Sequence, residues 1–351
     1  MTLVKDKSFY KHFFSMMFLL VLQNVIALSV NLADNVMVTA YSETALSGVA
    51  AVNQLQFILQ QLMLGTGDAL VSICSQYWGE GKTKPIKSIA KAAYVTAGLI
   101  ALGFFAAASL FPYQLVHCFS NNEAIIAEGV KYLHTVKYTY LLFAVTNVTL
   151  AMLRSVETVK IAFAVSAAAF CINCGINFLL INGHFGFPRL GVTGAAIRTL
   201  CARAAECAIV LVYVFCFDKK LGASLANLFK ADKLLMGDYF KHCKFFLIVA
   251  ALFGTSTALQ TVILGHLTDA AIAANAASNS IFQILKVASI GASASAAVMI
   301  GKAIATGDKS VVKSYTQTLQ IIFLCIGACT STALFFLRAP VLSLYGNLSP
   351  E

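Results

Sequence analysis

Nine long apolar runs dominate the sequence and restrict the chain to one class of fold. Each run reaches the roughly 20 residues that a helix needs to cross the hydrocarbon core of a bilayer. Backbone amides in lipid must be hydrogen-bonded within their own segment, so the runs predict membrane-spanning helices and an all-α integral membrane protein. In chain order the runs cover residues 13–38, 46–73, 92–111, 130–152, 161–181, 192–217, 245–264, 272–300 and 319–337.

The composition agrees with this interpretation. Hydrophobic residues make up 59% of the chain and charged residues 11%, whereas a soluble domain carries about 25% charged residues. The net charge of +10 is spread over short clusters between the apolar runs, which is a membrane pattern. It therefore argues against a nucleic-acid partner and favours a lipid bilayer.

Lysine and arginine residues gather in alternate loops. By the positive-inside rule this asymmetry predicts a multi-pass protein of the plasma (inner) membrane with a cytoplasmic amino terminus. The opposite loops carry Arg189 and Arg338. The residues on the predicted cytoplasmic side are Lys5, Lys7, Lys11, Lys82, Lys84, Lys87, Lys91, Arg154, Lys160, Lys219, Lys220, Lys230, Lys233, Lys241, Lys244, Lys302, Lys309 and Lys313.

The chain contains an internal repeat. With a shift of 226 positions and no gap, ten residues between Val36 and Lys87 meet identical residues between Val262 and Lys313. Six spans separate the matched starts, so the repeat is parallel, as in some secondary transporters. We expect an amino-terminal six-helix lobe over residues 1–217, a cytoplasmic inter-lobe loop over 218–244 and a partial second lobe over 245–351. The second copy stops after three spans, so we expect nine of twelve helices here.

Asp34 is a carboxylate near the end of the first apolar run. On insertion scales a carboxylate at a helix centre costs roughly 2.5–3.5 kcal/mol, so such residues usually face a protein interior. Asn24 and Asn31 fall on nearly the same helical face as Asp34. Two interpretations remain open, namely a functional group inside the bundle and a solvated group at the outer interface.

The fifth and sixth runs add neutral oxygens. Asn173 and Asn177 are four residues apart and share one helical face, and Thr199 follows the small residues that open the sixth run. Asparagine can supply an oxygen to a cation, but it also commonly bonds a neighbouring helix. One carboxylate with several neutral oxygens suits a hard monovalent cation, and the carboxylate alone suits a proton.

Further polar residues lie in the second and eighth runs. Asn53, Gln56 and Gln60 share one face, which could line an aqueous cavity together with Phe57 or could pack as amides between helices. Lys286 either faces the same cavity or extends its side chain to the cytoplasmic surface.

No pattern favours an enzyme. The sequence has no Gly-Lys-Ser/Thr phosphate loop and no histidine pair with metal-ligand spacing. Cys171 and Cys174 lie within a single span without a second pair, so they are interpreted as inert thiols. No cofactor is expected beyond Na⁺ or H⁺ as a coupling ion.

Several motifs, in the right order, resemble the multidrug and toxic compound extrusion (MATE) family. The resemblance covers nearly the whole chain. The motifs are Gln23-Asn24 with Asn31-Leu32-Ala33-Asp34-Asn35-Val36-Met37-Val38, Ser75-Gln76-Tyr77-Trp78-Gly79-Glu80-Gly81, and Asn173-x3-Asn177 followed by Gly186-Phe187-Pro188 and Gly191-Val192-x-Gly194-Ala195-Ala196-Ile197-x-Thr199. Leu19 departs from the pattern, because a proline is common at its place.

The resemblance implies a monomeric two-lobe transporter that exports small organic cations in exchange for Na⁺ or H⁺ by alternating access. It also implies a cation site at Asp34, Asn173, Asn177 and Thr199, with the Ala195 carbonyl nearby. Asn177 replaces an aspartate found in some members, which lowers the charge of that site. Two alternatives stay open: a lipid-linked oligosaccharide flippase, for which the directions of Lys286 and Arg198 would be informative, and a non-transporting truncated remnant.

Overall fold

The structure is a computed structural model that describes residues 3–39, 43–180, 191–221, 232–264 and 269–344. Within these ranges the side chains of some helical residues, including 30–39, 177–180 and 269–281, lie outside the described set. Every regular element in the described ranges is a helix. The helices are α1 Lys7–Thr39, α2 Glu43–Gly79, α3 Thr83–Leu110, α4 Pro112–His117, α5 Glu123–Val136, α6 Thr139–Ser155, α7 Lys160–Leu180, α8 Gly191–Val212, η2 Tyr213–Phe217, α10 Lys233–Leu264, α11 Asp269–Ile304 and α12 Lys309–Leu344.

Each predicted span has a helical counterpart, which confirms the all-α membrane architecture. In the described part of the chain, 6 helices are long and apolar enough to cross a bilayer, and up to 7 if the bent pair α5–α6 is one span. The fourth predicted span differs from a straight helix, because α5 and α6 meet at an angle of 52°. Thr139 Oγ1 donates to the Val136 carbonyl at 2.6 Å, and such local side-chain bonds compete with the helical ladder.

The bounds of the helices confirm the parallel repeat. α10, α11 and α12 begin at Lys233, Asp269 and Lys309, each 226 positions after the start of α1, α2 or α3. Gly81, which follows α2, has a φ of 72°, and its counterpart Gly307 after α11 has a φ of 70°. A left-handed residue of this kind ends a helix at low cost only if it is glycine. Both copies therefore turn into their third helix in the same way.

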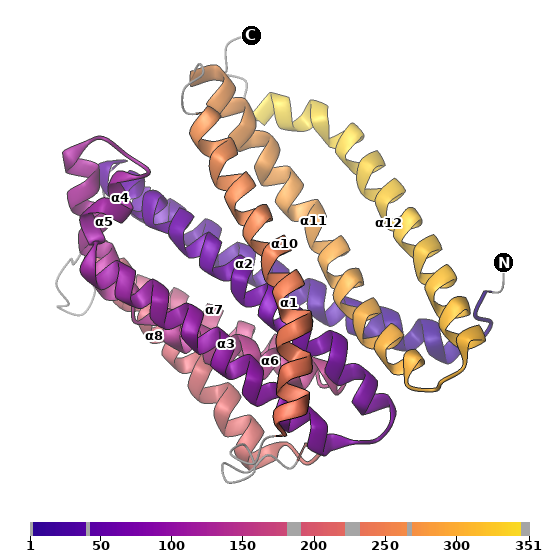
Figure 1. The fold of residues 1–351 in the computed structure, drawn as a ribbon. Coiled ribbons are helices and arrows are strands. Elements are labelled where there is room, and N and C mark those ends of the chain that lie inside the picture. Colours follow the sequence, from indigo (N-terminus) through magenta and orange to yellow (C-terminus); the bar gives the residue numbers. More distant parts are fainter. Residues whose placement is uncertain (1–2, 40–42, 181–190, 222–231, 265–268, 345–351) are drawn as a thin grey trace.

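The second copy packs on the first through the paired helices (Figure 1). α10 lies across α2 and α3, α11 lies along α1 and α2, and α12 covers the outer side of α11. The two groups of helices meet at the end that carries the amino terminus and diverge toward the other end. This arrangement leaves the faces of α10 and α12 exposed and apolar, as at Phe245, Val249 and Leu324, which suits contact with lipid tails.

Small residues allow the helices of the first lobe to approach closely. On α3 the buried alanines are Ala90, Ala92, Ala93, Ala97, Ala101 and Ala108. Because lipid is as apolar as a leucine side chain, helix association in membranes depends on close van der Waals packing, to which such small residues contribute. The cavity described below is therefore built on tightly packed elements.

Gly48 lies where α2 approaches the backbone of α5 closely. A Cβ there would lie 2.7 Å from the backbone nitrogen of Gly129 and 2.8 Å from the Ile125 carbonyl oxygen. Because backbone atoms cannot move aside locally, we expect Gly48→Ala to destabilise the protein by about 1–3 kcal/mol. Thermal unfolding in detergent would measure this loss. Gly103→Ala is the matched control, since a Cβ at Gly103 meets nothing within 4 Å, and an equal loss in both variants would contradict the prediction.

Candidate ion and substrate cavity

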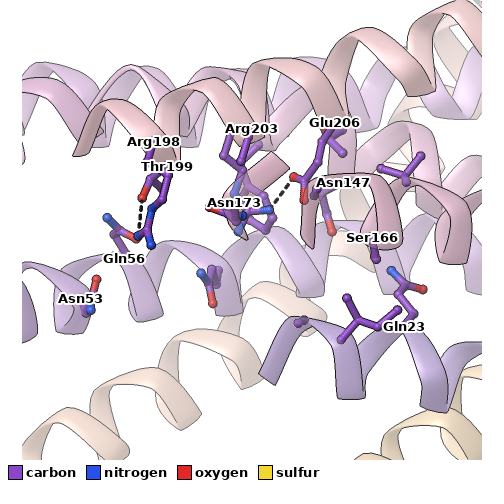
Figure 2. A pocket seen from close by; sticks show the side chains of 18 of the residues that line it. Gln23, Asn53, Gln56, Asn147, Ser166, Asn173, Arg198, Thr199, Arg203 and Glu206 are labelled. Atoms are coloured by element: carbon purple, nitrogen blue, oxygen red, sulfur yellow. Dashed lines mark hydrogen bonds and ion pairs between the residues drawn. The ribbon is translucent and has the colours of Figure 1, made fainter. Parts of the chain in front are cut away.

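A cavity of about 490 Å³ lies among the helices of the first lobe (Figure 2). Its described lining comes from α1, α2, α5, α6, α7 and α8. Its lining contains both polar and apolar side chains. The polar lining residues are Gln23, Asn24, Asn53, Gln56, Gln60, Tyr132, Thr146, Asn147, Ser166, Asn173, Arg198, Thr199, Arg203 and Glu206.

Three of the five predicted cation-site residues line this cavity. Asn173 on α7 is 8% exposed, and its Oδ1 accepts no hydrogen bond from the residues that the structure describes. Thr199 Oγ1 on α8 donates to the Ala195 carbonyl at 2.9 Å. The side chains of the other two, Asp34 and Asn177, lie outside the described set.

The neutral oxygens of this group suit a cation. A buried carbonyl oxygen without a donor costs roughly 1–3 kcal/mol, and a bound cation or its water would offset that cost for Asn173. The Thr199 hydroxyl donates to the Ala195 carbonyl and accepts a hydrogen bond from Arg198 Nη2 at 3.4 Å, so one lone pair of its oxygen remains for a ligand. Oxygen donors of this type are the ligands that hard cations prefer.

Four of the five predicted substrate residues line the same cavity, namely Asn53, Gln56, Phe57 and Gln60 on α2. Their common helical face therefore points into the first lobe. Lys286 on α11 is not among the lining residues. Its Nζ lies 4.9 Å from the centroid of the Phe253 ring, and that ring lies 6.5 Å from the ring of Phe57, so Lys286 lies behind the cavity wall.

The structure adds charged groups that the sequence did not assign to the cavity. Arg198 on α8 is 2% exposed and its Nη2 lies 3.4 Å from Thr199 Oγ1. Arg203 and Glu206, one turn further along α8, form an ion pair of 2.7 Å, and the Arg203 guanidinium lies 4.9 Å from the centroid of the Phe143 ring. The intervals of five and three residues between Arg198, Arg203 and Glu206 were visible in the sequence, but the neighbours that these side chains face were not.

Asn147 is a further cavity residue that the sequence analysis did not assign to the cavity. Its Nδ2 donates to the Met63 carbonyl at 2.6 Å, which joins α6 to α2 across the wall. The available signal was an asparagine in the middle of an apolar run, which in membranes usually bonds a neighbouring helix.

A family model described as MatE matches residues 20–179 and 246–349, which is well over half of the chain. The chain belongs to the MatE family. The family membership points to transport rather than catalysis and to a multi-pass membrane protein.

Two relatives named probable multidrug resistance protein NorM show how far this MatE chain extends along longer proteins. The protein of Thermotoga maritima is 27% identical over 194 residues, which cover 55% of this chain and 42% of the relative. The protein of Streptococcus pneumoniae strain R6 is 24% identical over 325 residues, which cover 91% of this chain and 70% of the relative. The MatE chain thus spans less than half of the first relative and about two thirds of the second.

Solved structures show the same fold as this MatE chain. A crystal structure described as MATE in the bent conformation has a TM-score of 0.84 at 14% identity and covers 97% of this chain and 75% of its own. The MATE transporter VcmN of Vibrio cholerae has a TM-score of 0.83 at 17% identity and covers 96% of this chain and 75% of its own. At these identities the likeness concerns the fold.

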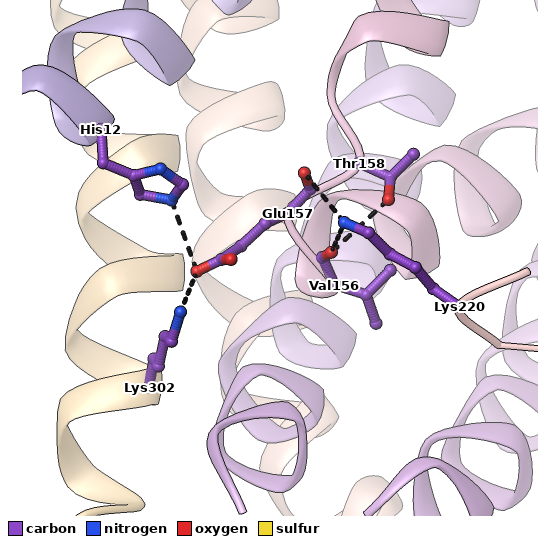
Figure 3. Close-up of polar contacts among 6 residues, drawn as sticks. All are labelled: His12, Val156, Glu157, Thr158, Lys220 and Lys302. Carbon is purple, nitrogen blue, oxygen red and sulfur yellow. Dashed lines mark hydrogen bonds and ion pairs between the residues drawn. The ribbon is translucent and has the colours of Figure 1, made fainter. Parts of the chain in front are cut away.

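A polar cluster around Glu157 joins the two parts of this MatE protein at the end that carries the amino terminus (Figure 3). Glu157 lies between α6 and α7, and its Oε1 accepts from Lys302 Nζ of α11 at 2.9 Å. The same oxygen lies 3.4 Å from Nε2 of His12 on α1. Lys220 Nζ donates to the Val156 carbonyl at 2.8 Å and so holds the turn from the other side.

Glu157 adopts an uncommon backbone conformation. Its φ is 59°, in the left-handed region that disfavours most non-glycine residues. Burial raises the pKa of the Glu157 carboxyl, but the Lys302 hydrogen bond and charge, the His12 charge and a Trp78 hydrogen bond outweigh it and lower the pKa below its ordinary value. The carboxylate therefore stays ionised, and its interactions stabilise the turn despite the strained φ.

Proposed function

We propose that the protein is a cation-coupled antiporter that moves small organic compounds across the membrane. The observation that carries this proposal is the buried Oδ1 of Asn173, which has no hydrogen-bond donor among the described residues and shares with Thr199 and Ala195 a cavity large enough for an organic substrate. Family membership supports transport as the activity. The multidrug names of the two relatives support organic compounds as the substrates.

The proposed ion site consists of Asp34, Asn173, Asn177, Thr199 and the Ala195 carbonyl, with Na⁺ or H⁺ as the coupling ion. Asp34 would carry the negative charge, and the neutral oxygens would complete the coordination. Substrate would lie against Asn53, Gln56, Phe57 and Gln60. Sharing one cavity would let ion and substrate compete for the same space, which is the requirement for exchange rather than co-transport.

Alternating access requires that one end of the molecule closes while the other opens. The cluster at Glu157 ties α1, α11 and the α6–α7 turn together at one end, and the helices diverge toward the other end. We propose that this arrangement is the outward-facing state, with the amino terminus in the cytoplasm and the protein in the inner membrane as a monomer. The proposed units are the lobe 1–217, the loop 218–244 and the partial lobe 245–351.

Ethidium accumulation in a pump-deficient bacterium tests the proposal. Cells that express the protein should retain less dye than cells with an empty vector, and dissipation of the proton or sodium gradient should remove the difference. A version extended to twelve helices, measured alongside, distinguishes a chain that is inactive alone from a fold that does not transport. Equal retention in the vector control and in both versions would overturn the proposal.

A further inference from the structure

Lys137 differs from the other lysines that the structure describes, because its side chain is buried. It is 9% exposed and lies at the 52° bend between α5 and α6. Its Nζ lies 5.6 Å from the centroid of the Phe105 ring of α3 and 5.6 Å from that of the Tyr138 ring. Ring faces attract a cation, but they are not the oxygen acceptors that the three N–H donors of an ammonium require.

The ammonium of Lys137 has no oxygen partner among the residues that the structure describes. A lysine at the end of a helix commonly bonds the last carbonyls, and Lys137 directly follows α5 without doing so. Its nitrogen is not one of the enclosed polar atoms of the described chain. The methylene stem is therefore the buried part, and the ammonium keeps access for a ligand.

The amino terminus of α6 lies at the same bend and adds positive partial charge. Its N-cap residue, Tyr138, makes no side-chain cap hydrogen bond. The first amides of a helix are orphan donors at the positive end of the helix dipole, which together favour an anion. Lys137 Nζ lies over the ring of this same N-cap residue. A buried side chain with an accessible ammonium and an uncapped helix start thus define one anion site.

The surroundings of this site favour an anion that belongs to a lipid. On α3, Leu99 and Leu102 lie within two turns of Phe105 and are exposed apolar side chains. A Cβ at Gly98 would meet nothing within 4 Å, so the strip beside them is open. α5 lies at the end of the molecule away from the amino terminus (Figure 1). The strip therefore leads from the bend toward the middle of α3, as an acyl chain does below its headgroup.

We propose that Lys137 and the start of α6 bind the phosphate of an anionic phospholipid, with an acyl chain along Leu99 and Leu102 of α3. The phosphate supplies the acceptors that the ammonium lacks, and the rings of Phe105 and Tyr138 flank it. A lipid bound there bridges α3 and the bend, so it stabilises this part of the first lobe. The site lies outside the transport cavity and does not depend on the compound that the protein moves.

Native mass spectrometry of the purified, delipidated protein in detergent tests the preference for an anionic lipid. The first phosphatidylglycerol should bind at least about tenfold more tightly than phosphatidylcholine, whose headgroup has no net charge, since hydrogen bonds between charged groups are the stronger ones. Inorganic phosphate at the same concentration should not displace it, because it lacks the acyl chains. Equal affinity for the two lipids, or displacement by inorganic phosphate, would overturn the proposal.

Three variants locate the bound lipid. Lys137→Gln should lower the affinity for phosphatidylglycerol about tenfold, and Lys137→Arg should keep most of it, because arginine retains the charge. Lys131→Gln is the matched control on α5. Lys131 pairs with Glu128 at 2.6 Å, and its loss should change the affinity less than about twofold. An unchanged affinity in Lys137→Gln, or an equal loss in Lys131→Gln, would refute the site.

A photoactivatable phosphatidylglycerol with a diazirine in its acyl chain locates the lipid on the unaltered protein. Labelling should fall on α3 around Leu102 and on the first turn of α6. Labelling confined to other helices would overturn the proposal, even if Lys137→Gln fails to fold. None of these measurements uses efflux, so a failure of the proposed antiporter would leave their outcome unaffected.

Discussion

Replacement of Glu157 by glutamine is expected to reduce dye efflux about tenfold. The variant keeps the shape of the side chain but loses the charge that Lys302 and His12 contact at 2.9 Å and 3.4 Å. Glu157 is 13% exposed, so its charge-assisted hydrogen bonds are worth more than those of a surface pair. A loss of about 1.4 kcal/mol from the state closed at this end corresponds to a tenfold change in its population.

Initial efflux rates and amide hydrogen exchange measure the effect together. The amides of the α6–α7 turn and of the last turn of α11 should exchange faster in the variant, because the contact between them opens more often. Unchanged rates and unchanged protection in Glu157→Gln would show that the cluster has no part in closure.

Charge reversal is the matched control for this contact. Lys302→Glu alone places two carboxylates together and should reduce efflux at least as much as Glu157→Gln. The double variant Glu157→Lys with Lys302→Glu should recover part of the activity, because the pair is restored with opposite polarity. Glu157→Gly separates charge from strain, since glycine accepts a φ of 59° freely. Normal efflux in Glu157→Gly would show that the loss of efflux in Glu157→Gln comes from the strained backbone and not from the missing charge.

The pH dependence of the contact follows from the lowered pKa of Glu157. A carboxyl whose folded pKa lies below its unfolded value contributes stability above the unfolded pKa, and this contribution is lost as the pH falls through the folded pKa. The difference in thermal stability between the unaltered protein and Glu157→Gln should therefore be constant near neutral pH and vanish in acid. A difference that grows toward acid would contradict this assignment.

Asn173→Ala is expected to raise the ion concentration for half-maximal efflux about tenfold while it leaves thermal stability unchanged or slightly higher. The variant removes an oxygen that we propose as an ion ligand, and it also removes a buried acceptor that has no donor among the described residues. Loss of an unsatisfied buried group is not destabilising in itself. A weaker response to the ion together with unchanged or higher thermal stability would identify Asn173 as an ion ligand. A structural asparagine would instead lose stability on this substitution.

Efflux by Asn173→Ala, measured against Na⁺ concentration and against pH, shows for which of the two ions the site has lost affinity. Asp34→Asn should abolish coupling to that ion, because the proposed ion site would then lose its own carboxylate. Ser166→Ala, also on α7 and also lining the cavity, is the control and should change neither property. Lower stability of Asn173→Ala without any change in ion response would instead identify Asn173 as a bond between helices.

The sequence determined the membrane class, the helical nature of each apolar run and the repeat. Apolar runs of membrane length have few folded alternatives, since lipid forces every backbone group to bond within its own helix. The repeat was visible because a uniform shift of 226 positions preserves residues such as Gly81 and Gly307, whose left-handed backbone requires glycine. The break between α5 and α6 was not predicted, because the apolar run 130–152 continues through it.

The tertiary structure decided which polar groups share one space. From the helical period alone, Asn53, Gln56 and Gln60 could be placed on one face, but the partner of that face depends on how the helices of the first lobe pack together. Arg198 faces the cavity and Lys286 lies on the rings behind it because of the rotation of α8 and α11, which long-range packing sets. The contact of Glu157 with Lys302 joins residues 145 positions apart, and no local pattern encodes an interaction that exists only once separate helices have packed.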